Sequence, residues 1–400
     1  MINVAVLGFG TVGSGVVELI EMNQAHITTK LENQLNVKYI LDIRDFPDSP
    51  YKDKFVKDFS VIENDPEIKV VAEVIGGATF AYDYTVRALK AGKSVVTSNK
   101  ELVAQKGYEL LQLAKEHNVN YFFEASVGGG IPLIRPMHRC MAANEVTEVY
   151  GILNGTTNFI LTKMIEENMA FADALKTAQE LGYAEADPTA DVEGIDACRK
   201  ICILSSLAFG HHVYPKDVYA EGISKISLDD VAIADENGYA IKLIGQAQNY
   251  GNNIKAMVSP ALVPHTSLLS SVKDVFNSVL MRGNAVGDVF LCGRGAGKLP
   301  TASAVVADIL DAAKHFEFLK GWGWQDEIAN RVLSQEELDF SWYLRVENTR
   351  EELLAQYPDA DVIFDENGVI AAITKVENNG EHQKKQKNLK VLSAIRVLQL

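Results

Sequence analysis

A short apolar stretch, residues 2–7, runs directly into three glycines, Gly8, Gly10 and Gly13, and a helix-like segment with apolar residues at 16–20 follows. In such a strand–turn–helix unit, one glycine permits the tight turn and the second lets the backbone approach a pyrophosphate. The third lets the helix pack on the strand. The placement predicts a dinucleotide-binding turn, although a purely structural glycine turn can have the same spacing.

The first third of the chain alternates strand-like and helix-like segments. The expected strands lie at 2–7, 37–41, 70–75, 94–97 and 120–124, and the expected helices at 11–22, 81–91 and 103–117. This rhythm predicts an α/β fold with a parallel, Rossmann-type sheet covered by helices on both faces. Residues 23–36 are polar and show no clear period. We expect the nucleotide-binding domain to comprise residues 1–132 together with about 301–320.

Two further parts follow. Residues 133–300 are expected to form an α+β substrate and dimerisation domain, with strands at 146–153, 240–247, 254–263 and 285–291 and helices at 159–167, 171–181 and 195–209. A glycine-rich turn at 293–301 opens an apolar helix at 302–314 that should pack on the first domain. Residues 338–400 should form a small tail, with strands at 341–346, 361–364, 369–376 and 390–397, a helix at 350–356 and a solvated charged loop at 377–390.

Composition limits the partners. The 400 residues include 38 Lys and Arg against 53 Asp and Glu, a formal net charge of −15, which disfavours nucleic acid or an anionic membrane as a partner. The four cysteines show no paired spacing, and Cys198 and Cys202 stand one helical turn apart, so buried thiols are expected. No basic leader or membrane-length apolar run is present. We expect a soluble cytoplasmic protein.

The acid-rich segment 182–200 ends at Lys200. In a helix, Asp196 and Lys200 would share one face, with the acid N-terminal as the favourable order requires. A proline and a glycine interrupt the preceding residues, so Glu185 and Asp191 are expected on a loop. Such carboxylates can hold the ammonium of an amino-acid substrate while the lysine meets the reacting oxygen. A solvated acidic loop with one ordinary helical ion pair is the alternative.

Seven segments, taken in order, carry a resemblance that spans nearly the whole chain. They are Gly8-Phe-Gly-Thr-Val-Gly13, Glu73-Val-Ile-Gly-Gly77, Val96-Thr-Ser-Asn-Lys-Glu-Leu-Val-Ala104, Phe123-Glu-Ala-Ser-Val-Gly-Gly-Gly-Ile-Pro132, Gly151-Ile-Leu-Asn-Gly-Thr-Thr-Asn-Phe159, and the stretches 182–200 and 293–301. Each is modest alone, but their order and spacing are specific. The chain resembles the homoserine dehydrogenase family, which is built from a Rossmann domain, an α+β substrate domain and, here, a shortened tail resembling an ACT domain.

The resemblance implies reversible, NAD(P)-dependent hydride transfer between L-homoserine and L-aspartate 4-semialdehyde. It makes Lys200 the general acid/base and places Lys100 beside the nicotinamide and the substrate, while Glu185 and Asp196 hold the amino-acid end or orient the lysines. We expect burial and a neighbouring cation to lower the pKa of Lys200. Alternatively, Lys200 stays charged and stabilises the developing alkoxide while water carries the proton. The residues implied at the cofactor are Gly8, Phe9, Gly10, Thr11, Val12, Gly13, Arg44, Lys100, Gly182, Glu185 and Gly297.

The resemblance also implies a monovalent cation, most simply sodium, held by the backbone carbonyls of Glu124, Val127, Gly129 and Ile131. Oxygen ligands in a tight glycine turn suit a hard cation and not zinc. A glycine turn without an ion is the alternative.

The choice between NADP and NAD depends on the end of the second strand. Arg44 matches the family's arginine that pairs with a ribose 2′-phosphate, whereas an acid at this point favours the bare 2′-hydroxyl of NAD. Asp42 is an unusual acid in this strand. We expect NADP as the preferred cofactor.

The tail departs from the family pattern. Residues 342–346 match the first strand of an ACT domain, but the acidic residue and glycine that bind an effector are not evident in 347–352. We expect weak or absent threonine inhibition, and a homodimer or higher homo-oligomer joined through the middle domain. Two other functions remain open: a non-catalytic nucleotide and amino-acid sensor, and a dehydrogenase for another small amino alcohol.

Overall fold

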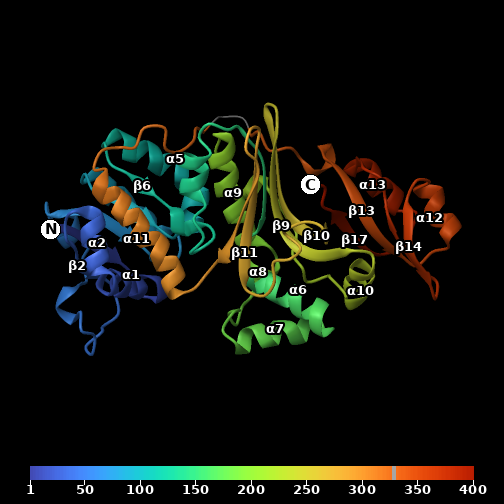
Figure 1. Cartoon of the computed structure of the whole chain (residues 1–400), viewed down its shortest axis with the longest axis horizontal. Helices are drawn as coiled ribbons and strands as arrows, with labels where there is room; N and C mark the ends of the chain where they lie inside the picture. Colours follow the sequence, from blue (N-terminus) through green and yellow to red (C-terminus); the bar gives the residue numbers. More distant parts are fainter. Residues whose placement is uncertain (327–329) are drawn as a thin grey trace. The chain divides into compact units, whose positions relative to one another are not determined.

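The computed structural model describes residues 1–326 and 330–400. They fold into two compact units. The first contains residues 1–145, 202–215 and the described residues from 293 to 326, and the second contains 146–201, 216–292 and the tail from 330 onward. Each unit is built on one sheet (Figure 1).

The sheet of the first unit has six strands, all parallel, in the order β3-β2-β1-β4-β5-β6. Their bounds are β1 (Ile2–Leu7), β2 (Leu35–Leu41), β3 (Phe55–Val56), β4 (Ile68–Glu73), β5 (Ser94–Thr97) and β6 (Tyr121–Phe122). This is the strand order of a dinucleotide-binding sheet, whose ligands lie outside the carboxyl ends of the strands. The predicted Rossmann-type fold is confirmed.

Helices cover this sheet. They are α1 (Thr11–Met22), α2 (Gln24–Leu31), α3 (Ser60–Glu63), α4 (Thr79–Lys90), α5 (Lys100–Glu116) and α11 (Lys298–Lys314), with short turns η1 (Lys52–Lys54), η2 (Glu124–Ser126) and η3 (Pro136–Cys140). Helix α11 packs on α1 so closely that a Cβ on Gly15 would lie 2.9 Å from Lys298 Cγ. The lack of regular structure expected at 23–36 was wrong for α2, whose period is hidden because Ile27 is its only buried residue.

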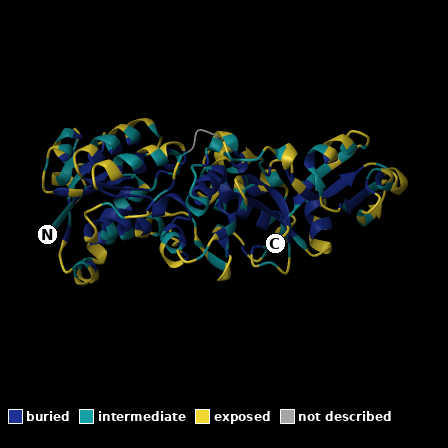
Figure 2. Cartoon of the chain, turned by 90° about the horizontal axis from the view of Figure 1, so that it is seen from above, coloured by how far each residue is buried: buried dark blue, intermediate teal, exposed yellow. Residues whose placement is uncertain are grey.

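The second unit contains a mixed sheet in the order β12-β11-β7-β9-β10-β17-β13-β15-β14, to which β8 and β16 add short pairings. The bounds are β7 (Val146–Ile152), β8 (Tyr219–Ala220), β9 (Tyr239–Tyr250), β10 (Asn253–Pro264), β11 (Phe276–Gly283), β12 (Gly287–Arg294), β13 (Asp339–Val346), β14 (Asp361–Glu366), β15 (Val369–Ile373), β16 (Glu377–Asn378) and β17 (Val391–Val397). Sequence reasoning missed β11. In Figure 2 buried residues are concentrated in the central strands of both sheets, whereas the edge strands β12 and β14 contain no buried residue.

The helices α6 (Gly155–Glu167), α7 (Phe171–Glu180), α8 (Thr189–Val192), α9 (Ile195–Phe209) and α10 (Leu228–Glu236) accompany the middle strands, and the tail adds α12 (Arg350–Gln356), α13 (Asn379–Gln386) and the turn η5 (Gln335–Glu337). The turn η4 is Pro215–Asp217. Helix α9 has the predicted bounds. Asp191 was expected on a loop, but it lies in α8, a single turn that fits between the flanking proline and glycine.

The tail forms a β-α-β-β-α-β arrangement with the two-residue strand β16 inserted before its second helix. The solvated loop expected at 377–390 was wrong, because α13 occupies most of it. Asn378 caps this helix by accepting a bond from Gly380 N at 3.0 Å, and His382 is buried against Trp342 with ring centroids 4.2 Å apart. Only Asn379 and His382 of this helix are buried, and its remaining side chains are charged or polar, so no apolar period marks it as a helix.

The last strand joins the tail to the middle domain. β17 pairs with β10, and Leu398 N donates to Leu262 O at 2.9 Å. Leu398 then enters a core cluster with Tyr150, Ile244 and Leu269. The tail therefore extends the sheet of the middle domain.

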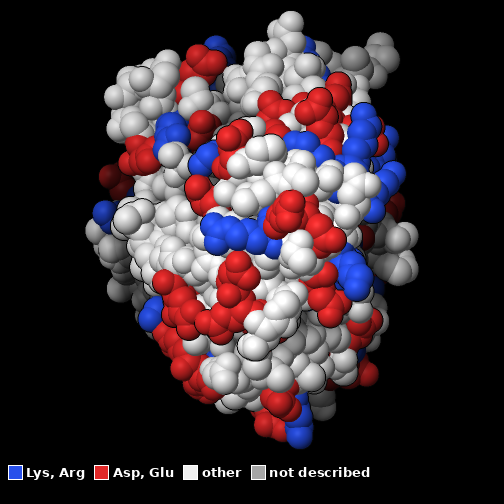
Figure 3. Space-filling model, turned by 90° about the vertical axis from the view of Figure 1, so that its right-hand side faces the viewer, with Lys and Arg blue, Asp and Glu red and all other residues white. Residues whose placement is uncertain are grey.

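Among the described residues, no helix has the length and apolar character that crossing a membrane requires. The face of the molecule in Figure 3 shows Lys and Arg side chains interspersed with carboxylates.

Candidate active site

The glycine turn, residues 8–13, joins β1 to α1. A Cβ on Gly13 would lie 1.9 Å from Gly8 O, which no side chain can tolerate, and Gly8 has a φ of +94° that favours glycine. A Cβ on Gly10 would meet nothing within 4 Å. Gly8 and Gly13 therefore form the turn itself, whereas Gly10 leaves open space in front of the backbone.

That open space faces the start of α1. Gly10 is the N-cap, with no side-chain capping bond and no acid in the first turn, so the first N–H groups of the helix are available to an anion. A hollow of about 650 Å³ adjoins this turn, lined among others by Phe9, Ser14 and Lys298. The arrangement fits a dinucleotide pyrophosphate.

Arg44 and Asp42 stand at the carboxyl end of β2. Arg44 Nε and Nη2 donate to the two oxygens of Asp42 at 3.0 and 2.9 Å. Asp42 also accepts from the backbone N–H groups of Phe9, at 2.7 Å, and Arg44, at 2.9 Å. Burial opposes ionisation of Asp42, but these four bonds outweigh it and lower its pKa to about 2. Each carboxylate oxygen accepts two bonds, so the usual acceptor sites of Asp42 are filled.

Two predicted motifs meet at the carboxyl ends of β4 and β5. Buried Glu73 accepts from Ile75 N at 2.8 Å and Thr97 Oγ1 at 2.7 Å. Asn99 caps α5 and donates to Gly77 O at 2.6 Å. These bonds fix the start of α5, where Lys100 is the first residue, at the edge of the sheet where ligands bind.

The turn at 128–130 packs against the second glycine-rich turn. Gly129 has a φ of +54°, and a Cβ there would lie 2.5 Å from Gly295 O, while Gly130 N donates to Arg294 O at 3.1 Å. Gly297 follows as the N-cap of α11, with a φ of +117°. Only glycine permits this approach of two backbones.

The Glu124 carboxylate next to this turn is fully engaged. It accepts from the N–H groups of Leu133, Ile134 and Arg135 at 2.6 to 2.8 Å. It would bind a cation only by losing those bonds, whereas its carbonyl receives one long contact of 3.5 Å from Val127 N.

The carbonyls of Val127, Gly129 and Ile131 accept no hydrogen bond from any residue that the structure describes. No group of three His, Cys, Asp or Glu residues suited to a metal is found in the described chain. The donors thus fit an oxygen-bound monovalent cation.

In the second unit, Lys200 lies at the centre of a buried charged site. Its Nζ donates to Asp196 Oδ2 at 2.7 Å and to Leu153 O at 2.7 Å, and its side chain is 10% exposed. The predicted pairing of Asp196 with Lys200 across one helical turn is confirmed. We call Leu153, Asn154, Asp191, Asp196 and Lys200 the Lys200 corner.

Sequence reasoning missed Asn154 as a member of this corner. Its Nδ2 donates to Asp191 Oδ1 at 2.7 Å and to Asp196 Oδ2 at 3.0 Å. The available signal, an asparagine at the end of a buried strand, indicates a helix cap but no partner far along the chain. Burial raises the pKa of Asp191, and the Asn154 bond partly offsets this.

Glu185 and Gly182 lie away from these contacts. Glu185 is exposed, and its carboxylate makes no hydrogen bond or ion pair with the described residues. Gly182 has a φ of +74° with no atom near its Cβ position. Their assigned roles stay predictions.

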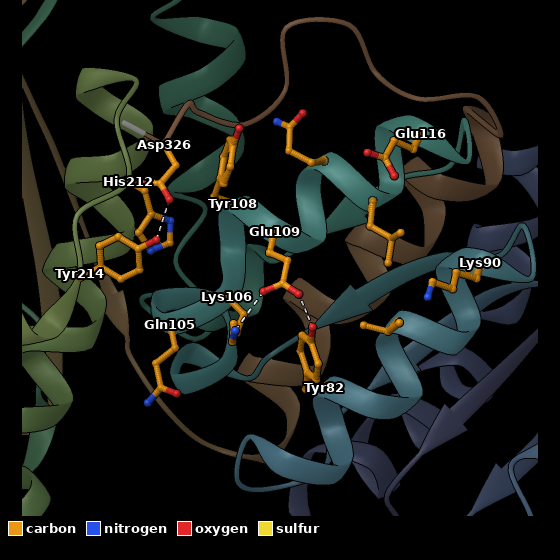
Figure 4. Close-up of a pocket in the computed structure, with 13 residues that line it drawn as sticks. Tyr82, Lys90, Gln105, Lys106, Tyr108, Glu109, Glu116, His212, Tyr214 and Asp326 are labelled. Carbon is orange, nitrogen blue, oxygen red and sulfur yellow. Dashed lines mark hydrogen bonds and ion pairs between the residues drawn. The ribbon is translucent and has the colours of Figure 1, made fainter. Parts of the chain in front are cut away.

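Another hollow, of about 570 Å³, lies beside α4 and α5 in the first unit (Figure 4). Its polar groups largely satisfy one another: Tyr82 and Lys106 both bond Glu109, and Tyr214 donates to Asp326 at 2.7 Å. None of the predicted site residues lines it. We do not assign the cofactor or the substrate to this hollow.

The four cysteines form no disulfide bond with one another in the described chain. Cys198 and Cys202 are buried as expected, whereas Cys140 and Cys292 are exposed.

Comparison with known proteins identifies related sequences for both units. Residues 132–310 match the family model described as homoserine dehydrogenase, and residues 8–124 match that described as homoserine dehydrogenase, NAD binding domain. The chain is 44% identical over 319 residues to the homoserine dehydrogenase of Bacillus subtilis (strain 168), covering 78% of this chain and 73% of that protein.

Two experimental structures extend the comparison. The crystal structure of a homoserine dehydrogenase from Thiobacillus denitrificans matches with a TM-score of 0.91 and 35% identity, covering 99% of this chain and 98% of that chain. A hyperthermophilic archaeal homoserine dehydrogenase in complex with NADPH matches with a TM-score of 0.67 and 29% identity, over 80% of this chain and 99% of that one.

Proposed function

The chain belongs to the homoserine dehydrogenase family, and from that premise we propose how its residues divide the work of the reaction. The enzyme is an NAD(P)-dependent oxidoreductase that interconverts L-homoserine and L-aspartate 4-semialdehyde. The nicotinamide supplies the hydride chemistry, and the protein supplies position and proton handling. The first test is NAD(P)H absorbance with homoserine and each cofactor in turn; no change with either would refute the activity.

Lys200 is the group that handles the proton at the substrate oxygen, with Lys100 beside the reacting carbon. The observation that carries this proposal is a buried ammonium held by Asp196 and Leu153 O, which gives it one orientation. A lysine fixed in this way either transfers the proton or stays charged and stabilises the alkoxide while water carries the proton. A solvent isotope effect on Lys200→Arg and parental enzyme separates these two roles, since arginine keeps the charge but cannot give up its proton.

Asp196 and Glu185 hold the substrate ammonium. Asp191 joins them, because it accepts a hydrogen bond from the same Asn154 amide as Asp196 does. Asp196→Ala and Glu185→Ala should raise KM for homoserine strongly, since each removes a partner of that ammonium. An unchanged KM in both variants would show that the substrate ammonium binds elsewhere.

NADP is the preferred cofactor, with Arg44 as the partner of the 2′-phosphate. Two features support this. Asp42 has no acceptor site left for the 2′-hydroxyl of NAD, and Arg44 Nη1 has no hydrogen-bond partner among the described residues. The related archaeal protein was crystallised with NADPH.

Sodium binds the carbonyls of Glu124, Val127, Gly129 and Ile131 and ties the turn at 128–130 in place. The three carbonyls without protein donors support this set. Thermal denaturation in NaCl, KCl and choline chloride at equal ionic strength is the test, independent of turnover. Equal unfolding midpoints in all three salts would refute the proposal that a cation is bound.

The remaining assignments follow the family. Residues 1–132 with about 301–320 bind the cofactor, 133–300 bind the substrate and form the dimer, and 338–400 are an ACT-like tail. Light scattering that shows a monomer would refute the dimer. The cytoplasm is the proposed location, because it is a reducing compartment in which an exposed thiol such as Cys140 stays reduced. Threonine inhibition should be weak or absent, which titration with threonine tests directly.

A further inference from the structure

One side chain, Asn154, touches every charged group of the Lys200 corner except the lysine itself. It ends the loop after β7 and caps α6, and it is 5% exposed. Its Oδ1 accepts from Thr157 N at 2.9 Å and from Thr157 Oγ1 at 3.0 Å. Its Nδ2 donates to both Asp191 and Asp196.

The orientation of this amide is determined by its partners. The N–H of Thr157 requires an acceptor, so Oδ1 must face the helix. A flipped amide would put its oxygen against two carboxylates and its NH₂ against a backbone donor, losing the bonds to Asp191, Asp196 and Thr157 N. Asn154 therefore always presents its two N–H groups to the acids.

The bond to Asp196 also reaches Lys200. Asp196 Oδ2 accepts from Asn154 at 3.0 Å and from Lys200 Nζ at 2.7 Å, and Lys200 donates to the carbonyl of Leu153, the residue just before Asn154. One oxygen and one neighbouring peptide thus fix the lysine. A change at Asn154 would move both of these anchors together.

We propose that Asn154 is a positioning residue that holds the carboxylates of Asp191 and Asp196 side by side, so that Lys200 and the ammonium site form together. This inference rests on the proposed roles of those three residues. Two carboxylates that share one neutral donor repel less than two bare ones, because each N–H directs its positive end at one oxygen. Aspartate or serine could cap α6 equally well but would not supply both N–H groups.

The charge state of Asp191 depends on groups from both neighbouring helices. Asp191 is acted on by Asp196 and Lys200 from α9, while α6 contributes the neutral Asn154 and Thr156. Burial raises the pKa of Asp191, the Asn154 bond lowers it, Asp196 raises it and Lys200 lowers it. Removing the Asn154 donor must therefore raise it further, and the ionised form is lost at a higher pH.

The experiment compares Asn154→Ser and Asn154→Asp in the full-length enzyme with homoserine and cofactor. Both keep a capping oxygen for Thr157 N, but serine is neutral and aspartate adds a third carboxylate. We expect kcat/KM for homoserine to fall roughly 10–100-fold, the scale of a lost bond to a charged group. The acid limb of the pH profile should move up by about one pH unit with serine and further with aspartate. Cofactor affinity should stay parental.

Thr157→Val is the matched control, because it removes a hydroxyl bonded to the same amide and leaves both N–H bonds to the acids. Its acid limb should coincide with that of the parent. If both Asn154 variants melt earlier but keep the parental acid limb, Asn154 is only a helix cap and the proposal is refuted. Should the serine variant not fold, the aspartate variant gives the same comparison. A parental enzyme that does not oxidise homoserine refutes the proposed function instead.

Discussion

The candidate site residues fall into two sets, which we call the backbone half in the first unit and the charged half in the second unit, and the two sets differ in the groups that they present. In the first unit the glycine turn and the turn at 128–130 present backbone, and their shape comes from positions where no Cβ fits. In the second unit the Lys200 corner consists of three charged side chains, one amide and the carbonyl of Leu153, linked by hydrogen bonds of 2.7 to 3.0 Å. A substitution in the backbone half should therefore lower stability or ligand affinity by steric clash and leave the pH dependence unchanged. A substitution in the charged half should instead lower the catalytic rate or shift its pH dependence while the protein still folds.

The largest expected effect comes from the charged half. Lys200→Ala should lower kcat about a hundredfold or more, the range of a positioned acid/base, with cofactor affinity unchanged. Lys163→Ala, which removes a lysine paired with Glu167 on α6, should keep the parental rate. Steady-state kinetics and cofactor fluorescence titration check both variants. Near-parental turnover of Lys200→Ala would mean that the charged half is structural.

The two halves of the site could not be predicted equally well from the sequence. The glycine turn was predictable because a backbone requirement leaves its mark on the very residues involved, and the pairing of Asp196 with Lys200 followed from helical spacing. The link from Asn154 to Asp191 and Asp196 spans 37 and 42 residues, and no local period encodes it.

The same limit applies to the fold. Five of the six strands of the first unit were predicted from local pattern, and only the two-residue strand β3 was missed. The pairing of β17 with β10, and so the union of tail and middle domain, depends on contacts between strands more than a hundred residues apart.

The second prediction compares two glycine substitutions in the backbone half. Gly13→Ala places a Cβ 1.9 Å from Gly8 O, so we expect about 1–3 kcal/mol of lost stability and weaker cofactor binding. Gly10→Ala meets nothing within 4 Å, so its stability should stay parental while cofactor affinity alone falls. Urea denaturation with fluorescence titration distinguishes them. Parental cofactor affinity in Gly10→Ala would show that no ligand approaches this backbone.

The third prediction concerns the one charged contact of the backbone half. Arg44→Ala should weaken NADP more than NAD by roughly 1–3 kcal/mol, as expected for a lost charged hydrogen bond. It also frees acceptor sites on Asp42, which should help the 2′-hydroxyl of NAD. Dissociation constants for both cofactors provide the measurement. Equal losses for the two would show that Arg44 does not read the phosphate.

The smallest effect tests whether a buried acid beneath the backbone half matters for binding at all. Burial raises the pKa of Glu73 from 4.5 to about 7, against the opposing bonds from Thr97 and Ile75. Because the folded-state pKa is raised, the protonated acid stabilises the fold fully below about pH 4.5, and this stabilisation is lost as the pH rises through about 7. Glu73→Gln keeps a neutral group of the same shape, so its advantage over the parent should grow by about 1 kcal/mol or more between pH 5 and pH 8. Asp308, whose pKa burial also raises to about 7, is present in both proteins, so its contribution cancels in the difference.

Urea denaturation of both proteins at the two pH values measures this difference in stability, with NADP affinity followed in parallel. NADP affinity should not change between the two pH values. Glu73 bonds Ile75 N and Thr97 Oγ1 from beneath the loop, and both bonds persist whether its carboxyl group is protonated or ionised. A matching pH shift in affinity would mean that the first half of the site also works through side-chain charge, and the contrast with the Lys200 corner would fail.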